Sequence, residues 1–314
     1  MTEQKSGSFL WIRASSPEEK EEVYRFRYAQ YFAEKGDLPG VDHVHKRVFL
    51  PHDEYSVHVA VRDNHGNLLA VGTATPANVR CIIPEWQCMF DLAKLSPVSK
   101  DLVLISRVIV ENSARLSPLF GQMSMHLASI GIENGFSYAA HYCAPCKIAL
   151  YERLGYRCYG LGHSLGHFFR IPMIFAIDAT DYLQRLRSPL SRLSGKRQAN
   201  SEKVDSLLKL FPELSELPLC ALSTEQRLQR LKRFCPGIAS AGNTLLQALM
   251  KAGIFRLPAG AILARNGQNE GSFFLLQGSI RTKNALIHPG VPFKTGPETL
   301  TAAEDCLAAS ITLQ

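Results

Sequence analysis

The run from Leu102 to Val110 is almost entirely apolar, and it constrains the fold more than any other part of the chain. A run of this length and composition predicts a central strand that is buried on both faces of a sheet. Ser117 and Pro118 follow it, and these residue types are typical of the cap and the first position of a helix. That helix is predicted to end at Asn134-Gly135, and the next strand is predicted from Phe136 to His141. The chain therefore places a buried strand, a helix and a second strand in succession.

Other local patterns extend this core into a mixed α/β domain over residues 9–185. The stretch from Pro76 to Lys100 is less regular and is expected to be a loop with one short helix. The remaining elements are predicted from apolar periodicity and turn residues: a helix at 18–32, a hairpin with strands at 57–61 and 68–73, a helix at 145–154 and a strand at 168–177.

Composition narrows the class of protein. The 314 residues suffice for two domains, and with 46% hydrophobic and 20% charged residues no apolar run approaches the roughly 20 residues of a membrane span. Without a signal-like N-terminus, and with eight scattered cysteines, we expect a cytoplasmic protein. Cys143 and Cys146 form the one close pair, which is too little for a metal site. The net charge of +7 is spread along the chain, so nucleic-acid binding is not expected, whereas an acidic carrier remains compatible.

The order of motifs around the central strand resembles the GNAT superfamily of N-acyltransferases. The resemblance is carried by Ser106-Arg107-Val108-Ile109-Val110, a loop led by Arg115, the helix after it, and Tyr151-x-x-x-Gly155-Tyr156. It implies a mixed sheet flanked by helices, in which strands 102–110 and 136–141 splay apart and pair with the amides of a pantetheine arm. It also implies that a backbone N–H near Val108 to Val110 faces the thioester carbonyl. Tyr151 would protonate the departing thiolate, since an ordinary phenol can donate at neutral pH.

The helix start departs from the pattern of members that bind coenzyme A. Those members carry glycines where bare N–H groups hold the diphosphate. Here Pro118 has no N–H to donate, and Phe120 puts a large ring where the backbone should be approached closely. Arg115 and Ser117 remain as contacts for the donor. Because an acyl-carrier protein presents a single phosphate on its pantetheine, the sequence favours acyl-carrier protein over acyl-CoA as donor and partner.

The N-terminal part is similar to N-acyl amino acid synthases and to the related acyl-homoserine-lactone synthases. The matching residues include Arg27 in the first helix, Phe32 after it and Asp53 ahead of the hairpin, and the resemblance implies that these three bind substrate. Two positions depart from the lactone synthases. Leu104 stands where an acidic residue is expected, and Thr75 where an arginine is expected. We therefore expect an acceptor such as an amino acid and set lactone formation aside.

The general base is left open between two residues. His141, on the second splayed strand, has the better ordinary pKa, and Glu111 ends the first strand. A structural histidine and a solvated acid are the ordinary alternatives for these two. Arg107 could orient a substrate carboxylate with two hydrogen bonds, or it could form a buried structural pair.

A linker rich in Ser and basic residues is predicted at 186–203, and helices are predicted at about 203–216, 223–233 and 243–251. Within the third part of the chain, residues 204–314, the run from Leu245 to Arg281 resembles the β-roll of cyclic-nucleotide-binding domains. The phosphate-binding cassette of that family carries an Arg that is missing here. Lys294 and Glu298 are the remaining candidates for nucleotide contacts, and a degenerate roll that binds no nucleotide is expected.

The sequence thus predicts an N-acyltransferase that moves an acyl group from an acyl-carrier protein, or from acyl-CoA, to an amine, without a metal. Two alternatives stay open. One is a protein-lysine acetyltransferase regulated by a cyclic nucleotide, and the other is a catalytically silent sensor or scaffold.

Overall fold

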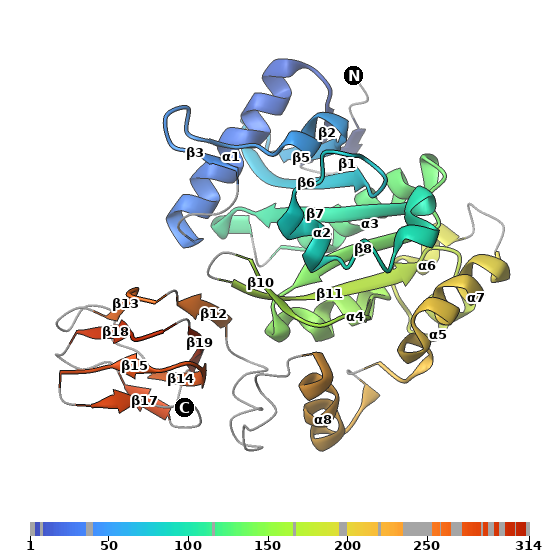
Figure 1. Cartoon of the computed structure of the whole chain (residues 1–314). Helices are drawn as coiled ribbons and strands as arrows, with labels where there is room; N and C mark the ends of the chain where they lie inside the picture. Colours follow the sequence, from blue (N-terminus) through green and yellow to red (C-terminus); the bar gives the residue numbers. More distant parts are fainter. Residues whose placement is uncertain are drawn as a thin grey trace. The chain divides into compact units, whose positions relative to one another are not determined.

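A computed structural model of the chain falls into two compact units (Figure 1). The first comprises Met1–His141, Arg153–Tyr156 and Ile174–Glu213, and the second comprises Tyr142–Glu152, Arg157–Met173 and Leu214–Gln314. The structure describes residues 4–6, 9–35, 40–114, 117–165, 168–194, 200–218, 221–234, 253–257, 259–264, 272–283, 285–287, 292–294, 299–304 and 306–311. Among these residues there is no helix with the length and apolarity that a membrane crossing requires.

A mixed sheet forms the centre of the first unit. Its strands lie in the order β1 (Gln4–Ser6), β2 (Phe9–Ala14), β5 (Val57–Arg62), β6 (Leu68–Pro76), β7 (Leu102–Val110) and β8 (Tyr138–Cys143). The pairs from β1 to β7 are antiparallel, whereas β7 and β8 run parallel. The predicted mixed α/β class is therefore confirmed. Eight of the nine residues of β7 are buried, which is the pattern expected from its apolar run.

Helices cover both faces of this sheet. Helix α1 (Pro17–Lys35) contributes Val23 and Tyr24 to an apolar cluster with Val71 of β6. A Cβ atom placed on the adjacent Gly72 would instead meet side chains of α3 (Leu119–Glu133). Because successive residues of a strand point to opposite faces, α1 and α3 lie on opposite sides of the sheet.

Helix α3 begins one residue later than predicted. Pro118 occupies the cap position rather than the first helical turn. The hydroxyl of Ser117 accepts a hydrogen bond from the backbone N–H of Leu119 at 3.3 Å. The hydroxyl therefore still satisfies one N–H at the helix start, although from outside the cap position.

The connection between β6 and β7 contains two short helices where one was predicted. These are α2 (Pro84–Met89) and the 3-10 helix η2 (Ser96–Asp101), and a proline lies at the start of each. Two further small elements precede β5, namely the ribbon of β3 (Val41–Asp42) with β4 (Arg47–Val48) and the 3-10 helix η1 (Pro51–Tyr55). Helix η1 brings a charged side chain into the interior of the unit, because it carries the buried Asp53.

The first unit continues past the predicted boundary at residue 185. It includes α5 (Thr180–Arg185), α6 (Ser191–Ser194) and α7 (Ser201–Leu210), and 3-10 helix η5 (Pro212–Ser215) follows. Tyr138 of β8 donates a hydrogen bond to the carbonyl of Lys203 at 2.7 Å, and the Lys203 ammonium pairs with Asp101. These contacts tie α7 to the central sheet, so the start of α7 is not a free connection.

The second unit contains two short stretches from the middle of the chain and the C-terminal sheets. Its first elements are 3-10 helix η4 (Pro145–Lys147), most of α4 (Ile148–Leu154), β9 (Arg157–Cys158) and β10 (His163–Leu165). The stretch after Tyr159 contains β10, which pairs antiparallel with β11 (Phe168–Ala176). Helix α8 (Thr224–Phe234) follows, while the helix predicted at 243–251 lies outside the described residues.

Short antiparallel strands make up the C-terminal part. One set lies in the order β12 (Gly253–Leu257), β19 (Cys306–Ile311), β14 (Ser272–Gln277) and β17 (Pro292–Lys294). The other lies in the order β13 (Ile262–Ala264), β18 (Leu300–Ala302), β15 (Ile280–Arg281) and β16 (Leu286–Ile287). Leu263, Leu275 and Ile280 are among the buried residues between these strands. The two sets form a β-rich module with its own apolar core.

Candidate functional site

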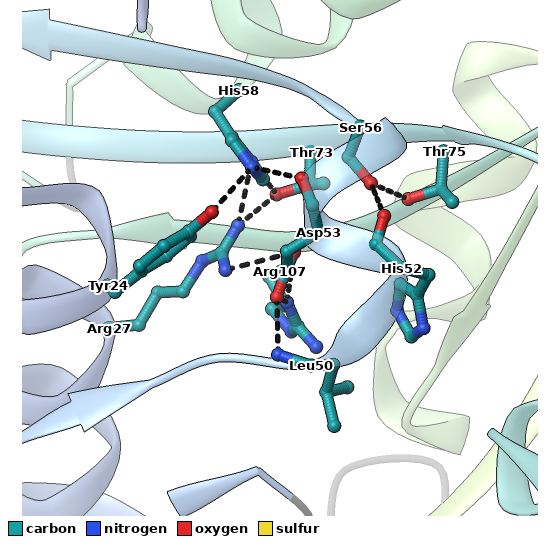
Figure 2. A network of polar contacts seen from close by, with 10 residues as sticks. All are labelled: Tyr24, Arg27, Leu50, His52, Asp53, Ser56, His58, Thr73, Thr75 and Arg107. Carbon is teal, nitrogen blue, oxygen red and sulfur yellow. Dashed lines mark hydrogen bonds and ion pairs between the residues drawn. The ribbon is translucent and has the colours of Figure 1, made fainter. Parts of the chain in front are cut away.

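A buried polar cluster lies where α1, η1 and the strands β5, β6 and β7 meet (Figure 2). We call it the Asp53 cluster, and it consists of Arg27, Asp53, His58, Thr73 and Arg107. Three of its members, Arg27, Asp53 and Arg107, were predicted from the sequence to bind substrate. The structure brings these three into direct contact with one another.

Asp53 is the centre of the cluster. Its Oδ1 and Oδ2 atoms both accept from Nη1 of Arg107, at 2.7 and 2.6 Å, and Oδ1 also accepts from Nη1 of Arg27 at 3.2 Å. The backbone N–H of Leu50 donates to Oδ2 at 2.8 Å, which fixes the carboxylate at the start of η1. The buried structural pair considered for Arg107 is thus present, and its partner is Asp53.

Charge and burial oppose each other within the cluster. Burial alone would raise the pKa of Asp53, but the nearby guanidinium groups of Arg27 and Arg107 outweigh it and hold that pKa well below its usual range. Burial lowers the pKa of Arg27 to about 10, against the opposing attraction of Asp53. All three groups are therefore charged at neutral pH, with two cations around one anion.

His58 on β5 is held in one neutral tautomer by its contacts. Arg27 Nη2 lies 3.0 Å from Nδ1 of His58, and because a guanidinium only donates, Nδ1 must be the acceptor. Nε2 then carries the proton and donates to the carbonyl of Asp53 at 3.0 Å. Burial, reinforced by the charge of Arg27, lowers the pKa of His58 to about 3. Thr73 completes this side, since its hydroxyl accepts from Arg27 Nη2 at 2.5 Å.

Arg107 reaches Asp53 from an irregular point of β7. Its φ of 50° lies in the left-handed region, which is uncommon for a residue with a side chain. Arg107 and Val108 together lie opposite Gly72 of β6, because the register jumps from Val71–Ile109 to Thr73–Ser106. This is a β-bulge, and it redirects the arginine out of the regular alternation of the strand.

The parallel pairing of β7 with β8 ends close to this bulge. Leu102, Val103 and Leu104 pair with Tyr138, Ala139 and Ala140, and the ladder stops there although both strands continue. On its other side β7 stays paired with β6 up to Val110. The two strands predicted to splay apart do lose their mutual pairing beyond Leu104.

The two positions that depart from the lactone synthases are neighbours in the sheet. Thr75 on β6 lies directly across from Leu104 on β7, and both side chains are fully buried. The Thr75 hydroxyl is 2.7 Å from the hydroxyl of Ser56, which in turn donates to the carbonyl of His52 at 2.7 Å. The pair therefore places a hydroxyl and an apolar side chain opposite each other, with no charge at either position.

The two candidate bases lie in different surroundings. His141 on β8 is buried, and its ring packs edge-on against Tyr156 with centroids 4.4 Å apart. Glu111 follows β7 and is half-buried, and its carboxylate accepts a hydrogen bond from the hydroxyl of Ser113. Val108, at the bulge, is half-buried, whereas Val110 is buried at the end of β7.

The remaining predicted site residues are placed less completely. Tyr151 is a half-buried residue of α4 in the second unit, and Ser117 lies just before α3. Arg115 and Glu298 lie outside the described residues, and so do the side chains of Phe32 in α1 and Lys294 in β17. Within the described part of the chain, no group of three or more His, Cys, Asp or Glu side chains could hold a metal ion.

Several members of the site were not predicted from the sequence. They are His58 and Thr73 in the cluster, and Ser56, His52 and Trp86 beside it. A usable signal existed for His58, because a lone histidine in the apolar run Val57 to Val61 indicates a buried polar partner. No comparable local signal marks Trp86, whose role depends on how the connection between β6 and β7 folds back.

Comparison with known proteins gives structural likeness alone. No protein-family model matches the chain, and no curated protein matches it. The fold is similar to FeeM, an N-acyl amino acid synthase from uncultured soil microbes, at 12% identity over 61% of this chain and 99% of that chain, with a TM-score of 0.45. It is also similar to BjaI, a CoA-dependent acyl-homoserine lactone synthase, at 15% identity over 57% of this chain and 89% of that chain, with a TM-score of 0.44. The fold is similar as well to TofI, solved in a ternary complex with an inhibitor and MTA, at 18% identity over 59% of this chain and 98% of that chain, with a TM-score of 0.46. Because these TM-scores are below 0.5, we infer function from this chain's own residues.

Proposed function

We propose that this protein is an N-acyltransferase that moves an acyl group from an acyl thioester to the nitrogen of an amine. The observation that carries the proposal is the early end of the β7–β8 ladder beside the bulge at Arg107. Beyond Leu104, one edge of β7 no longer pairs with β8. The amides of an extended pantetheine arm are suited to pair with a strand edge of this kind.

The chemistry needs a place for the thioester carbonyl and a source of a proton for the thiolate. The stretch from Val108 to Val110 lies past the end of the ladder, so its backbone N–H groups are the candidates that would stabilise the oxyanion. Tyr151 is the candidate proton donor. Arg107, oriented by Asp53, is the candidate contact for a carboxylate on the acceptor. His141 and Glu111 remain the candidates from the sequence for the base.

We favour an acyl-carrier protein as donor because of the start of α3. Pro118 has no N–H, and the N–H of Leu119 is engaged by the Ser117 hydroxyl. Two of the backbone donors that would hold a diphosphate are thus missing or occupied. The single phosphate of a carrier-bound pantetheine loses less from this change than the diphosphate of coenzyme A.

We favour an amino acid over a lactone-forming acceptor because of Thr75 and Leu104. These facing, buried positions carry neither of the two charges that the lactone synthases use there. A cationic acceptor held by a buried acid would find no counter-charge at Leu104. Arg27 and Arg107 leave the cluster with an excess of positive charge, which suits an acceptor that bears a carboxylate.

For the C-terminal sheets we propose a module that resembles a cyclic-nucleotide-binding roll and binds no nucleotide. A ligand at 100 times its Kd would stabilise the fold by about 2.7 kcal/mol. An unchanged melting temperature with saturating cyclic AMP or cyclic GMP is the expected result. A clear rise would favour the alternative of a nucleotide-regulated lysine acetyltransferase.

The activity is tested by offering the purified protein two donors, long-chain acyl-carrier protein and acetyl-CoA, each with pooled amino acids or a lysine peptide. Products are identified by mass spectrometry. We expect N-acyl amino acids from the carrier-bound donor. Turnover with acetyl-CoA and the peptide would overturn the donor and acceptor assignments, and no turnover with either donor would favour the scaffold.

A further inference from the structure

His52 is a buried histidine beside the Asp53 cluster whose imidazole ring has no assigned chemical role. It lies in η1 next to Asp53, its side chain is fully buried, and its ring packs on Trp86 with centroids 4.2 Å apart. Neither Nδ1 nor Nε2 forms a hydrogen bond of good geometry with any residue that the structure describes. The backbone of Cys81 lies near the ring and favours its protonated form, but it does not meet the criteria of a hydrogen bond to either nitrogen.

This arrangement is unfavourable unless another molecule completes it. A neutral imidazole carries one N–H donor and one acceptor, and burying either without a partner is unfavourable. His58, six residues later, shows the contrast, because both of its ring nitrogens are engaged. His52 therefore keeps a donor and an acceptor available in the interior of the first unit.

The ring of His52 lies near Arg107, the candidate contact for the carboxylate of the acceptor. The Trp86 ring that His52 packs on is also approached by the guanidinium of Arg107, whose Cζ lies 5.2 Å from the ring centroid. Ser106 precedes Arg107 on β7, is 4% exposed, and its hydroxyl has no hydrogen-bond partner among the described residues. Two uncharged polar side chains with unused hydrogen-bonding atoms thus flank Arg107.

We propose that His52 is the group that accepts the proton of the attacking amine. This inference rests on the proposed acyltransferase function and names its base. The amine nitrogen bonds to the thioester carbonyl carbon, the carbon–sulfur bond breaks, and one proton passes from that nitrogen to a ring nitrogen of His52. The departing thiolate takes up a proton from Tyr151, the proposed donor, and the products are an amide and a thiol. Water that enters as the products leave takes the proton from His52 and returns one to Tyr151, so both groups are restored.

The charges around His52 keep it ready for this role at neutral pH. Burial, followed by the charge of Arg107, lowers the pKa of His52 to about 4, with Asp53 on the same helix opposing the shift and Arg27 on α1 adding to it. The imidazole is therefore neutral at pH 7 and able to accept. The proton passes after the amine nitrogen has bonded to the carbonyl carbon, because that nitrogen is then more acidic than a free ammonium ion.

The chain supplies a matched control for the test. His126 on α3 is half-buried and stacks on Trp11 with centroids 5.1 Å apart, so it too is a histidine packed on a tryptophan. It lies on the helix that covers the opposite face of the sheet from α1. Replacing His126 by Gln changes a similar contact outside the proposed site.

The experiment measures kcat and KM of the full chain with saturating donor and amine. We expect His52→Gln to lower kcat by about 10²–10⁴-fold, the usual contribution of a general base, and His126→Gln to leave it within a factor of about two. The His52→Ala variant is then assayed with added imidazoles of different pKa. Restored turnover whose rate rises with the pKa of the added imidazole is expected, since a group that only fills space shows no such dependence.

The outcomes separate this inference from the proposed function. If the unaltered protein turns over and His52→Gln keeps its kcat, or if rescue is independent of imidazole pKa, then His52 is not the base. A loss of kcat in His141→Gln or Glu111→Gln with no loss in His52→Gln would assign the role to one of those residues instead. If the unaltered protein acylates no amine, the proposed function fails, and this inference fails with it.

Discussion

Arg27 on α1 and Arg107 on β7 donate to the same atom, Oδ1 of Asp53, at 3.2 and 2.7 Å. The carboxylate therefore keeps two buried guanidinium groups together that would otherwise repel each other. This one side chain thus connects α1 to the bulge of β7. We therefore expect substitutions of Asp53 to reduce the stability of the first unit more than substitutions of its neighbours.

Asp53→Asn is expected to lower the free energy of unfolding by about 3–5 kcal/mol, because it leaves two buried cations without a counter-charge. Urea unfolding followed by circular dichroism measures the change. The neighbouring and exposed Glu54 provides the control, and Glu54→Gln should stay within about 0.5 kcal/mol of the unaltered protein. Equal effects of the two variants would contradict the central place of Asp53.

Stability should fall as the pH drops below 6.5. The pKa values of His52 and His58 are lowered to about 4 and about 3 in the folded protein, so between about pH 6.5 and pH 4 the unfolded chain binds protons that the folded chain does not. Each histidine then costs about 1.4 kcal/mol per pH unit at most. Unfolding free energies measured at several pH values between 7 and 5 give the slope.

The matched variant for this pH dependence is His58→Gln, which removes one of the two titrating groups. Between pH 7 and pH 5, the slope of its unfolding free energy against pH should be smaller than that of the unaltered protein. The reduction corresponds to the uptake of at most about one proton on unfolding, and it does not depend on the stability of the variant at pH 7. An identical slope would show that His58 does not stay neutral in the folded state.

Gly72 should not tolerate a side chain. A Cβ atom there would lie 2.8 Å from Cδ1 of Leu127 and 3.1 Å from Sδ of Met123, opposite the bulge at Arg107. Gly72→Ala is expected to destabilise the fold by about 1–3 kcal/mol through overpacking. A Cβ atom added at Gly121 in α3 would meet open space, so Gly121→Ala should raise the free energy of unfolding by about 0.5–1 kcal/mol. Thermal unfolding of the two variants should thus shift in opposite directions.

Thr75 and Leu104 should behave as a coupled pair. Leu104→Glu buries a charge without a partner and is expected to be strongly destabilising, as is Thr75→Arg. In the double variant the new side chains face each other across β6 and β7, so its loss should be smaller than the sum of the single losses by about 0.5–3 kcal/mol. Additive losses in a double-mutant cycle would mean that the two side chains do not meet.

Local patterns in the sequence were sufficient for much of the first unit. The apolar run at Leu102 to Val110, the turn between β5 and β6, and the helical stripe after Pro118 each depend on near neighbours, and the elements they predicted are present. Predictions at the ends of elements were less accurate. The cap of α3 and the two helices between β6 and β7 depend on prolines whose effect on the backbone varies with the surrounding packing.

The resemblance selected Arg27 and Asp53 together with Phe32, and Arg107 was a separate candidate, but the sequence did not show that Arg27, Asp53 and Arg107 interact. Arg107 lies 54 residues after Asp53, and Thr73 lies 46 residues after Arg27, so no periodicity connects them. His52 and Trp86 were missed for the same reason. Their contact forms only when the connection after β6 packs against η1.

The sequence by itself determined the order of strands and helices, since helix and strand periods and turn residues act over a few positions along the chain. Only the tertiary structure decided which polar side chains share the buried space, which tautomer His58 adopts and where the β7–β8 ladder ends. Those properties arise from contacts between segments far apart in the chain. Burial then sets the protonation states, because a charge in the interior persists only where an opposite charge or a hydrogen bond is brought to it.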